Sequence, residues 1–290
     1  MSSLIQLLKI ANPVRAFALK NFSVTAHPDE VLQIPSREEG RFIRIHAYNT
    51  LHRSTPAPVL VNFHGSGFVN PLHGSDGEFC KFIVEKTGFA VLDCSYRLAP
   101  ENKFPAAVHD AEDAVQWVLS HPEKFDASQL SISGFSAGGI LSLVLSSVVF
   151  PHVTFKNVFA AYPPTDMVQS SADKIAPDTW RDGAPVELLD TFVKCYYSNP
   201  EEVQSVLASP AFIPAEMFPD RIFLATAACD RLCLEGEALG NKIKAATTKH
   251  VHMQRYDGCE HAFDKAYEKA SVQERAKDDL YEKMASFLIE

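Results

Sequence analysis

Several features that this 290-residue sequence lacks narrow its class. It has no basic surplus: 27 Lys and Arg stand against 36 Asp and Glu, for a formal charge of −9, so the electropositive footprint of a nucleic-acid-binding protein is missing. No apolar run approaches the roughly 20 residues of a membrane-spanning helix, which predicts no stable membrane insertion. Six cysteines are too few for a disulfide scaffold in a chain of this length.

The first residues also lack the pattern of a secretory signal. Gln6 and Lys9 interrupt a mildly apolar start, and no basic residue precedes the apolar part. We therefore expect a cytoplasmic protein whose cysteines are thiols. The composition, 46% hydrophobic and 22% charged, is that of an ordinary globular protein.

Short apolar β-type runs alternate with helical patterns after residue 40. Near-continuous apolar runs such as PVLVNF and FAVLDC are typical of a parallel sheet covered on both faces. The alternation predicts an α/β fold with a mostly parallel central sheet and helices on both faces. The predicted fold also has a helical cap, for which the two segments described next are the candidates. The predicted strands cover residues 41–48, 59–63, 89–95, 130–133, 158–162, 222–227 and 251–256, and the predicted helices cover residues 78–86, 106–119, 137–149, 234–246 and 265–288.

Two segments break this alternation. Residues 2–11 place leucines at helical spacing and Pro13 ends the run, which predicts a helix packed on the body, a lid over a pocket or an interfacial anchor. Residues 163–219 contain eight prolines and several aromatic side chains, a composition typical of a substrate-facing insertion. We therefore predict a single domain over residues 1–290, with cap elements from about 1–40 and 163–219.

The motif Gly134-Phe135-Ser136-Ala137-Gly138 lies between a predicted strand and a predicted helix. A sharp turn there needs glycine on both sides, and it lifts the hydroxyl of Ser136 clear of the sheet as a nucleophile. The N–H of Ala137 then lies at a helix start, where donors are unpaired and an anion is favoured.

A second loop, which begins at His64, directly follows the strand VLVNF. Its two glycines allow backbone N–H groups to turn toward one point, as an oxyanion requires. We expect the N–H groups of Ser66 and Gly67, together with that of Ala137, to form this oxyanion hole, with Gly65 shaping the loop.

A hydroxyl nucleophile needs a base, and the base needs an orienting carboxylate. Among eleven histidines, His261 is the best placed, after a strand and a turn and before a long helical pattern. Asp230 follows the apolar strand IFLATAA, at a strand end where active sites of open α/β sheets collect. Asp257 and Glu260 are rival carboxylates that we expect to shape the turn before His261.

The ordered motifs resemble those of the hormone-sensitive-lipase-like carboxylesterases. The resemblance covers about residues 55–290 and implies an α/β-hydrolase fold, a cap formed partly by the amino-terminal segment, and hydrolysis of carboxylic esters without a cofactor. The matching runs are His64-Gly65-Ser66-Gly67-Phe68, Tyr96-Arg97-Leu98-Ala99-Pro100-Glu101, Phe104-Pro105-Ala106-Ala107, Gly134 to Gly139, Asp230-Arg231-Leu232 with Glu235-Gly236, and Asp257-Gly258-Cys259-Glu260-His261-Ala262-Phe263.

The chain departs from the family pattern at positions close to the predicted nucleophile. Ser66 replaces a glycine, so we expect its side chain to narrow the acyl site, and Ala262 replaces another. Phe135 stands where an Asp is common, and we expect it to form an apolar wall behind Ser136. The side chains predicted to line the substrate pocket are Phe68, Phe135, Trp180, Phe192 and Tyr196.

The positions of three cysteines and one histidine raise the possibility of a zinc site. Cys229, Cys233, Cys259 and His261 could form a tetrahedral set, but their spacing fits no standard zinc motif, and buried thiols are the simpler interpretation. We therefore predict no metal and no cofactor.

The sequence thus predicts a serine carboxylesterase that hydrolyses short- to medium-chain or aromatic esters through an acyl-enzyme. The alternatives are an acyltransferase or lactonase of a biosynthetic pathway, and a non-hydrolytic small-molecule receptor on the same fold. The expected partner is a small-molecule ester, with no nucleic acid, and a homodimer is compatible with the sequence.

Overall fold

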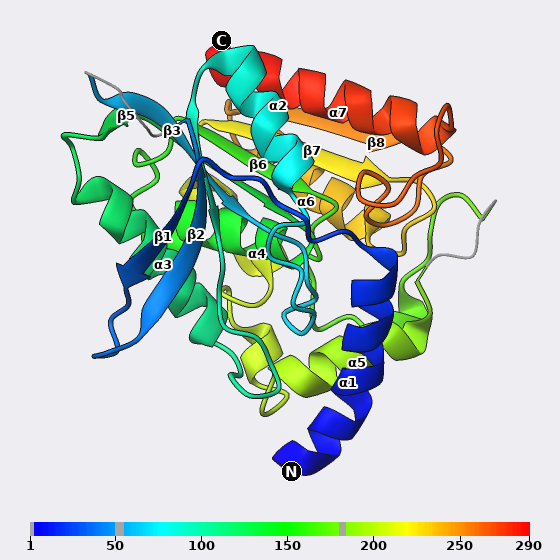
Figure 1. The fold of residues 1–290 in the computed structure, drawn as a ribbon. Helices are drawn as coiled ribbons and strands as arrows, with labels where there is room; N and C mark the ends of the chain where they lie inside the picture. Colours follow the sequence, from blue (N-terminus) through cyan, green and yellow to red (C-terminus); the bar gives the residue numbers. More distant parts are fainter. Residues whose placement is uncertain (1–2, 50–54, 180–183) are drawn as a thin grey trace.

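A central β-sheet with helices packed on both faces forms the body of the computed structural model, which describes residues 3–49, 55–179 and 184–290 (Figure 1). Within these residues the sheet order is β1-β2-β4-β3-β5-β6-β7-β8. The pairs β1–β2 and β2–β4 are antiparallel and all the others are parallel. The strands are β1 Glu30–Pro35, β2 Phe42–Tyr48, β3 Ala57–Phe63, β4 Ala90–Cys94, β5 Phe125–Phe135, β6 Asn157–Ala161, β7 Arg221–Ala227 and β8 His250–Tyr256.

The helices divide between the two faces of the sheet. Buried residues of α2 and α7 pack with one apolar cluster, and those of α3, α4 and α6 pack with the other. Figure 1 shows α2 and α7 side by side. The helices are α1 Leu4–Asn21, α2 Gly77–Thr87, α3 Ala106–Leu119, α4 Ala137–Val144, α5 Val186–Tyr196, α6 Cys233–Ala246 and α7 Val272–Ile289, with one π-turn at Leu145–Val149 and short 3-10 turns at Ser171–Asp173, Glu202–Gln204, Pro210–Phe212 and Ala215–Met217.

Strand β3 shows why its apolar run has no alternation with polar residues. Val59 and Val61 face the cluster that contains α3 and α4, whereas Leu60 between them faces the cluster that contains α2 and α7. All three are fully buried. Because successive side chains of a strand point to opposite faces, a strand covered on both sides must be apolar throughout.

Helix α1 corrects one expectation about the amino-terminal segment. It begins with a capping box formed by Ser3 and Gln6 and continues through Pro13 to Asn21, so the prediction that Pro13 ends the helix is wrong. Tertiary contacts hold the second half in place: Ala18 is buried, and the Arg15 guanidinium donates to the carbonyl oxygens of Val69 and Ala99. These contacts outweigh the backbone hydrogen bond that a helical proline removes.

Two boundaries also differ from the sequence prediction. Residues 30–35 form the edge strand β1, paired with β2, and do not belong to a cap. The last helix begins at Val272 and not at Lys265, because Lys265 and Asp264 are held by ion pairs and hydrogen bonds in the preceding loop. The mostly parallel α/β architecture itself is confirmed.

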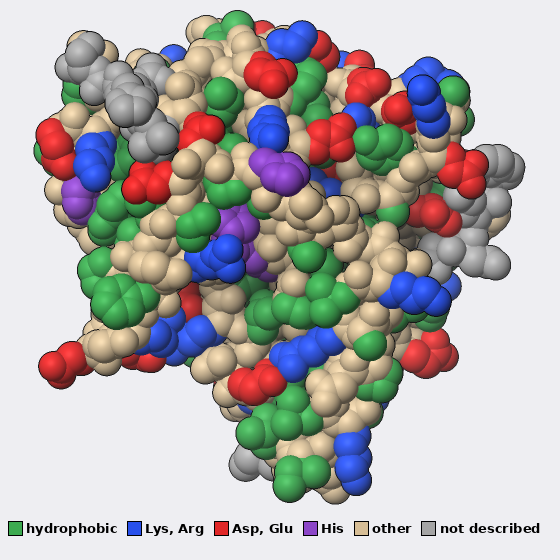
Figure 2. Space-filling view, in the orientation of Figure 1, with side chains coloured by type: hydrophobic (Ala, Val, Ile, Leu, Met, Phe, Trp, Pro, Cys, Tyr) green, Lys and Arg blue, Asp and Glu red, His purple; other side chains and the backbone are tan. Residues whose placement is uncertain are grey.

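Helix α1 projects from the body of the molecule (Figures 1 and 2). It leaves several apolar side chains exposed, including Ile5 and Phe17. In the described part of the chain, no helix combines the length and the apolar character needed to cross a membrane.

The turn from β5 into α4 depends on two glycines that leave no room for a side chain. A Cβ atom on Gly134 would lie 1.9 Å from the carbonyl oxygen of Gly138, and one on Gly138 would lie 1.9 Å from the carbonyl oxygen of Phe63. Between them, Ser136 has φ +51°. The close approach of β3, β5 and α4 therefore requires glycine on both sides of Ser136.

We expect Gly134→Ala to lower the free energy of unfolding by more than about 3 kcal/mol, because the new methyl group meets rigid backbone. Gly40→Ala is the matched control: Gly40 has φ +77° with open space around its Cβ position, and the change should cost only about 1 kcal/mol. Urea unfolding measures both changes. Equal losses in the two variants would contradict the steric account of the turn.

Candidate active site

Three side chains from loops that follow parallel strands meet at one edge of the sheet. Ser136 follows β5, Asp230 follows β7, and His261 follows β8. The carboxyl ends of parallel strands lie at a common edge, which is where open α/β sheets bind their ligands. The structure thus brings together the three residues predicted to act as nucleophile, orienting acid and base.

The distances among these side chains form an unbroken chain of hydrogen bonds. His261 Nδ1 lies 2.7 Å from Asp230 Oδ2, and His261 Nε2 lies 2.8 Å from Ser136 Oγ. A buried carboxylate can only accept, so the hydrogen of neutral His261 lies on Nδ1 and its Nε2 accepts from the serine hydroxyl. This arrangement can remove the hydroxyl proton as the oxygen attacks an electrophile.

Asp230, rather than either rival carboxylate, is the acid at His261 Nδ1. Its side chain is buried, and its second oxygen accepts from the backbone N–H of Leu232. Asp257 is exposed in the turn after β8, and Glu260 is only partly buried.

Backbone donors without an acceptor belong to residues of the pocket that holds Ser136. Among the described residues, none accepts a hydrogen bond from the backbone N–H of Gly67 or Ala137, and both residues line the pocket that holds Ser136. A Cβ atom on Gly65 would lie 3.3 Å from the carbonyl oxygen of Phe135 and 3.4 Å from Ser136 Cβ. Gly65 therefore lets the loop after β3 pass directly beside the serine.

Ser66 differs from the expectation about its side chain. Its hydroxyl lies 2.8 Å from the Tyr96 hydroxyl and accepts from the backbone N–H of Phe68 at 2.8 Å, so it points into the loop. Ser66 does not line the pocket. The prediction that its side chain narrows the acyl site is wrong, because these hydrogen bonds hold the hydroxyl in the interior.

An apolar pocket of about 750 Å³, part of it open to solvent, lies over Ser136 and His261. Three of the predicted pocket residues, Phe68, Phe192 and Tyr196, line it. The Phe68 and Tyr196 rings stack with centroids 4.0 Å apart. A Cβ atom on Gly67 would lie only 2.7 Å from the Phe192 ring, so α5 reaches the loop after β3 with no space between them.

Phe135 and Trp180 are the other two residues that were predicted to line the pocket. Phe135 is fully buried on the opposite side of the turn, where its ring contacts those of Phe79 and Tyr162, so its assignment to the pocket is wrong. The reason is strand geometry: Phe135 ends β5, and its side chain points into the cluster under α2 and α7. Trp180 lies outside the described residues.

Sequence reasoning missed most of the apolar wall contributed by α5. Leu188, Leu189 and Val193 line the pocket together with Phe192. Their spacing along the helix places them on one face, and this signal was present in the sequence. Ile140 of α4 and Met167 of the insertion carried no local signal, because only the fold brings them to the pocket.

A buried ionic cluster lies beside His261, and the sequence analysis did not anticipate it. Lys265 Nζ lies 2.7 Å from Asp264 Oδ2 and 2.8 Å from Asp76 Oδ1, and its side chain is only 7% exposed. Tyr162 donates a hydrogen bond to Asp264, and the Tyr162 ring meets the His261 ring edge-on, with centroids 4.9 Å apart. The cluster therefore packs against His261 through Tyr162.

These charges act on the proton affinity of His261. Burial opposes the charged imidazolium, but the carboxylates of Asp230 and Asp264 outweigh it and raise the pKa of His261 above its usual value. An imidazolium formed at His261 is therefore stabilised by two buried carboxylates.

The cysteine-based metal set weighed from the sequence is not gathered into a site. His261 is engaged by Ser136 and Asp230, and Cys233 Sγ donates to Glu237. Within residues 3–49, 55–179 and 184–290, the group of three whose metal-ligating atoms lie close together is His46, His73 and Asp93.

Comparison with known proteins agrees with this geometry. The family model described as alpha/beta hydrolase fold matches residues 60–265. An AB hydrolase superfamily protein of Schizosaccharomyces pombe is 28% identical over 276 residues, which cover 87% of this chain and 78% of that protein. Esterase LipI of Mycobacterium tuberculosis is 30% identical over 219 residues, which cover 70% of this chain and 65% of LipI. The thermophilic carboxylesterase EstE1, cloned from a metagenomic library, superposes with a TM-score of 0.79 at 26% identity, over 99% of this chain and 98% of EstE1.

Replacing Asp264 by Asn should lower the pKa of His261, because one of the two carboxylates that raise this pKa loses its charge. NMR titration of the His261 imidazole measures the pKa directly. Any activity that needs neutral His261 should then persist to lower pH, since the base stays unprotonated over a wider range. Asp257→Asn, at an exposed residue, is the control and should leave the pKa of His261 unchanged. An unchanged pKa of His261 in Asp264→Asn would contradict the electrostatic role of this cluster.

Proposed function

The chain belongs to the alpha/beta-hydrolase family, and on that basis we propose that it is a serine carboxylesterase acting on short- to medium-chain or aromatic carboxylic esters. The observation that carries the proposal is the continuous hydrogen bonding from Ser136 Oγ through His261 to the buried carboxylate of Asp230. Nucleophile, base and orienting acid are then supplied by protein groups alone.

The reaction proceeds through an acyl-enzyme. Ser136 Oγ attacks the ester carbonyl carbon while His261 Nε2 takes the hydroxyl proton, and Asp230 stabilises the imidazolium. The carbonyl oxygen becomes an oxyanion that accepts from the N–H groups of Ser66, Gly67 and Ala137. When the intermediate collapses, the alkoxide leaves and takes the proton from His261. A water molecule, deprotonated by His261, then attacks the acyl carbon, and the carboxylic acid is released as Ser136 regains its proton.

A cap formed by α1 and the insertion of residues 163–219 would close this pocket. Arg15 of α1 makes two hydrogen bonds to the Glu101 carboxylate, at 2.6 and 2.8 Å, which fixes α1 over the loop that follows β4. Helix α1 packs on α5 (Figure 1), and α5 lines the pocket. We infer that both segments belong to one domain with the sheet and that both contribute to substrate selection.

The lining favours the acyl or alcohol part of a small apolar ester. Phe192 and Tyr196 line the pocket that holds Ser136, whereas Phe135 and Ser66 do not line it. Each methylene that is buried contributes about 0.8 kcal/mol until overpacking costs about 1–3 kcal/mol. We therefore expect an optimum at short acyl chains, set mainly by the side chains of α5.

The alternative functions make different demands on the site. A non-hydrolytic receptor has no need of three reactive side chains in hydrogen-bond contact. An acyltransferase or a lactonase would use the same acyl-enzyme, so the partition of the acyl group between water and added alcohols separates these enzymes from a hydrolase. A cytoplasmic location and a homodimer remain part of the proposal, and neither is needed for the chemistry.

Ser136→Ala should reduce hydrolysis of p-nitrophenyl acetate by about 10⁴-fold or more while the fold persists, because only a hydroxyl at the turn is lost. A fluorophosphonate probe should label wild-type enzyme at Ser136, as located by peptide mass spectrometry. Ser128→Ala, at an exposed serine, should behave as wild type. Probe labelling elsewhere, or a Ser136→Ala variant within tenfold of wild type, would refute the assignment.

With the wild-type enzyme, kcat/KM across p-nitrophenyl esters should peak at acyl chains of about two to six carbons. Phe192→Ala should move this optimum to longer chains, because it removes a ring from the pocket wall. Phe135→Leu is the matched control, since this buried ring lies outside the pocket and its loss should affect stability rather than chain preference. A shift in preference for Phe135→Leu but not for Phe192→Ala would contradict this assignment of the pocket wall.

A further inference from the structure

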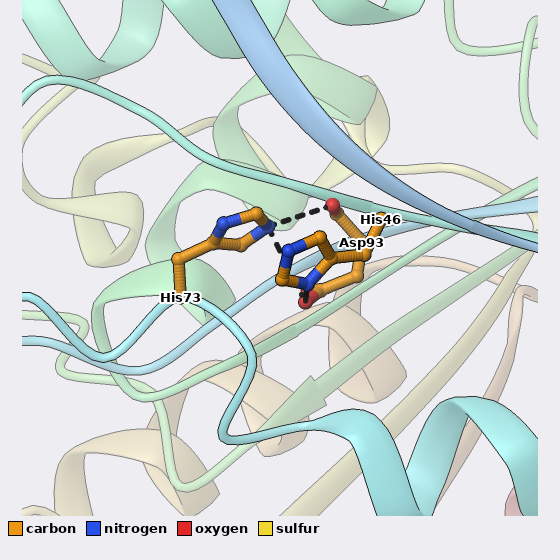
Figure 3. Close-up of side chains that lie close together, drawn as sticks. All are labelled: His46, His73 and Asp93. Carbon is orange, nitrogen blue, oxygen red and sulfur yellow. Dashed lines mark hydrogen bonds and ion pairs between the residues drawn. The ribbon is translucent and has the colours of Figure 1, made fainter. Parts of the chain in front are cut away.

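A buried group of two imidazoles and one carboxylate lies outside the active site (Figure 3). His46 Nδ1 lies 3.9 Å from Asp93 Oδ2, and His73 Nε2 lies 3.5 Å from the same oxygen. All three ligand-type atoms lie within 4.8 Å of one another. The side chains of His46 and Asp93 are 6% and 0% exposed, and that of His73 is 14% exposed.

Two of these atoms are buried without a hydrogen-bond partner. In the described structure, neither His46 Nδ1 nor Asp93 Oδ2 has a donor or acceptor within hydrogen-bond geometry. A buried polar atom left unpaired is unfavourable because it has lost its hydrogen bonds to water, so such atoms in a native structure call for an explanation. The two atoms lie 3.9 Å from each other.

The three residues come from separate segments that the fold brings together. His46 of β2 and Asp93 of β4 are direct cross-strand partners, so their side chains share one face of the sheet. His73 belongs to the loop between β3 and α2, and next to it Gly74, with φ +101°, brings the backbone close to the His46 ring. A ligand held by all three would join the loop to two neighbouring strands.

We propose that His46, His73 and Asp93 bind a divalent metal ion of the zinc class. Imidazole nitrogen and carboxylate oxygen are ligands that suit Zn²⁺, which binds them at about 2.0–2.2 Å. An ion bound between them would give both His46 Nδ1 and Asp93 Oδ2 a partner. With three protein ligands, a water molecule would complete the tetrahedral set.

Ligation requires a local rearrangement of the two rings. They stack with centroids 4.0 Å apart and planes inclined by 22°, so each must turn about its Cβ–Cγ bond for its nitrogen to face a common ion. The hydrogen bond from His73 Nε2 to the Asp93 carbonyl oxygen places the hydrogen on Nε2. Binding through Nε2 uses the other neutral tautomer, with the hydrogen on Nδ1.

Asp93 is the acidic member of this group. Asn62 Nδ2 donates to both Asp93 and Asp76, and within this buried group Lys265 is the cation that balances Asp76. Among the described residues, Asp93 forms ion pairs with His46 and His73 and with no Lys or Arg.

The ion would serve the structure and not the ester chemistry. None of its ligands touches Ser136, Asp230 or His261, and the link to the active site runs through Asn62, Asp76 and Lys265. The loop that carries His73 is continuous with the loop that carries Gly65 and Gly67. Metal binding therefore stabilises the segment that shapes the oxyanion region, and its test does not depend on the proposed reaction.

The first experiment measures zinc binding to the full chain after chelator treatment, with any affinity tag removed. Isothermal titration with Zn²⁺ should show one site per chain, and metal analysis after dialysis should find one zinc. A hundredfold excess of free Zn²⁺ over Kd should raise Tm by about 5 °C, because the metal binds only the folded state. The absence of one-to-one binding would overturn the proposal.

X-ray absorption of the zinc-loaded wild type identifies the ligands without any variant. The proposal requires nitrogen and oxygen neighbours with imidazole scattering and no sulfur. Sulfur in the first coordination sphere would place the metal at the cysteines instead and would overturn the assignment.

Isosteric variants then test each ligand. His46→Asn, His73→Gln and Asp93→Asn should each weaken zinc binding by about 100-fold or more, since each removes a direct ligand. His252→Asn is the matched control: His252 of β8 also has a buried, unpartnered nitrogen but lies in no such group. Its zinc affinity should match that of wild type. Wild-type zinc affinity in any of these three variants would show that the replaced residue is not a ligand.

Discussion

A single buried ammonium group holds together the segments that meet beneath the active site. Lys265 Nζ pairs with Asp76 at the start of α2 and with Asp264 in the His261 loop, and it lies 3.6 Å from the centre of the Phe135 ring at the end of β5. A buried charge without partners is so unfavourable that these groups must assemble together. The His261 loop, the turn at Ser136 and the loop before α2 are therefore fixed relative to one another by one interaction.

Close backbone contacts also fix the position of the turn that carries Ser136. Gly134 and Gly138 let α4 start directly against β3 and β5, and this contact presents Ser136 at the sheet edge with an unpaired N–H beside it. A site built on strand ends and a helix start is more precise than one built on loops alone. Outside the sheet, α5 lines the pocket over Ser136, and α1 packs against α5.

The loop between β3 and α2 runs from the candidate active site to the group of His46, His73 and Asp93. Its first part carries Gly65 and Gly67 next to Ser136, and its last part carries His73 next to the β2–β4 pair. Hydrogen bonds of Ser66 with Tyr96 and Phe68 keep the first part folded upon itself.

Ala262, where the family motif has glycine, has φ +59°, so the backbone beside His261 also keeps the shape that glycine usually provides.

Local patterns in the sequence determined the alternation of strands and helices and the positions of Ser136, Asp230 and His261 at strand ends, because apolar periodicity and turn glycines act within a few residues. Only the tertiary structure decided which way a side chain points when both faces of a strand are buried, and Phe135 faces away from the pocket for that reason. It also decided that Pro13 is tolerated within α1, since packing of the second half of the helix outweighs one lost hydrogen bond. The pairing of Lys265 with Asp76 and the meeting of His46, His73 and Asp93 join residues far apart in the chain. Strand register and the burial of charge create such contacts, and neither leaves a local signal in the sequence.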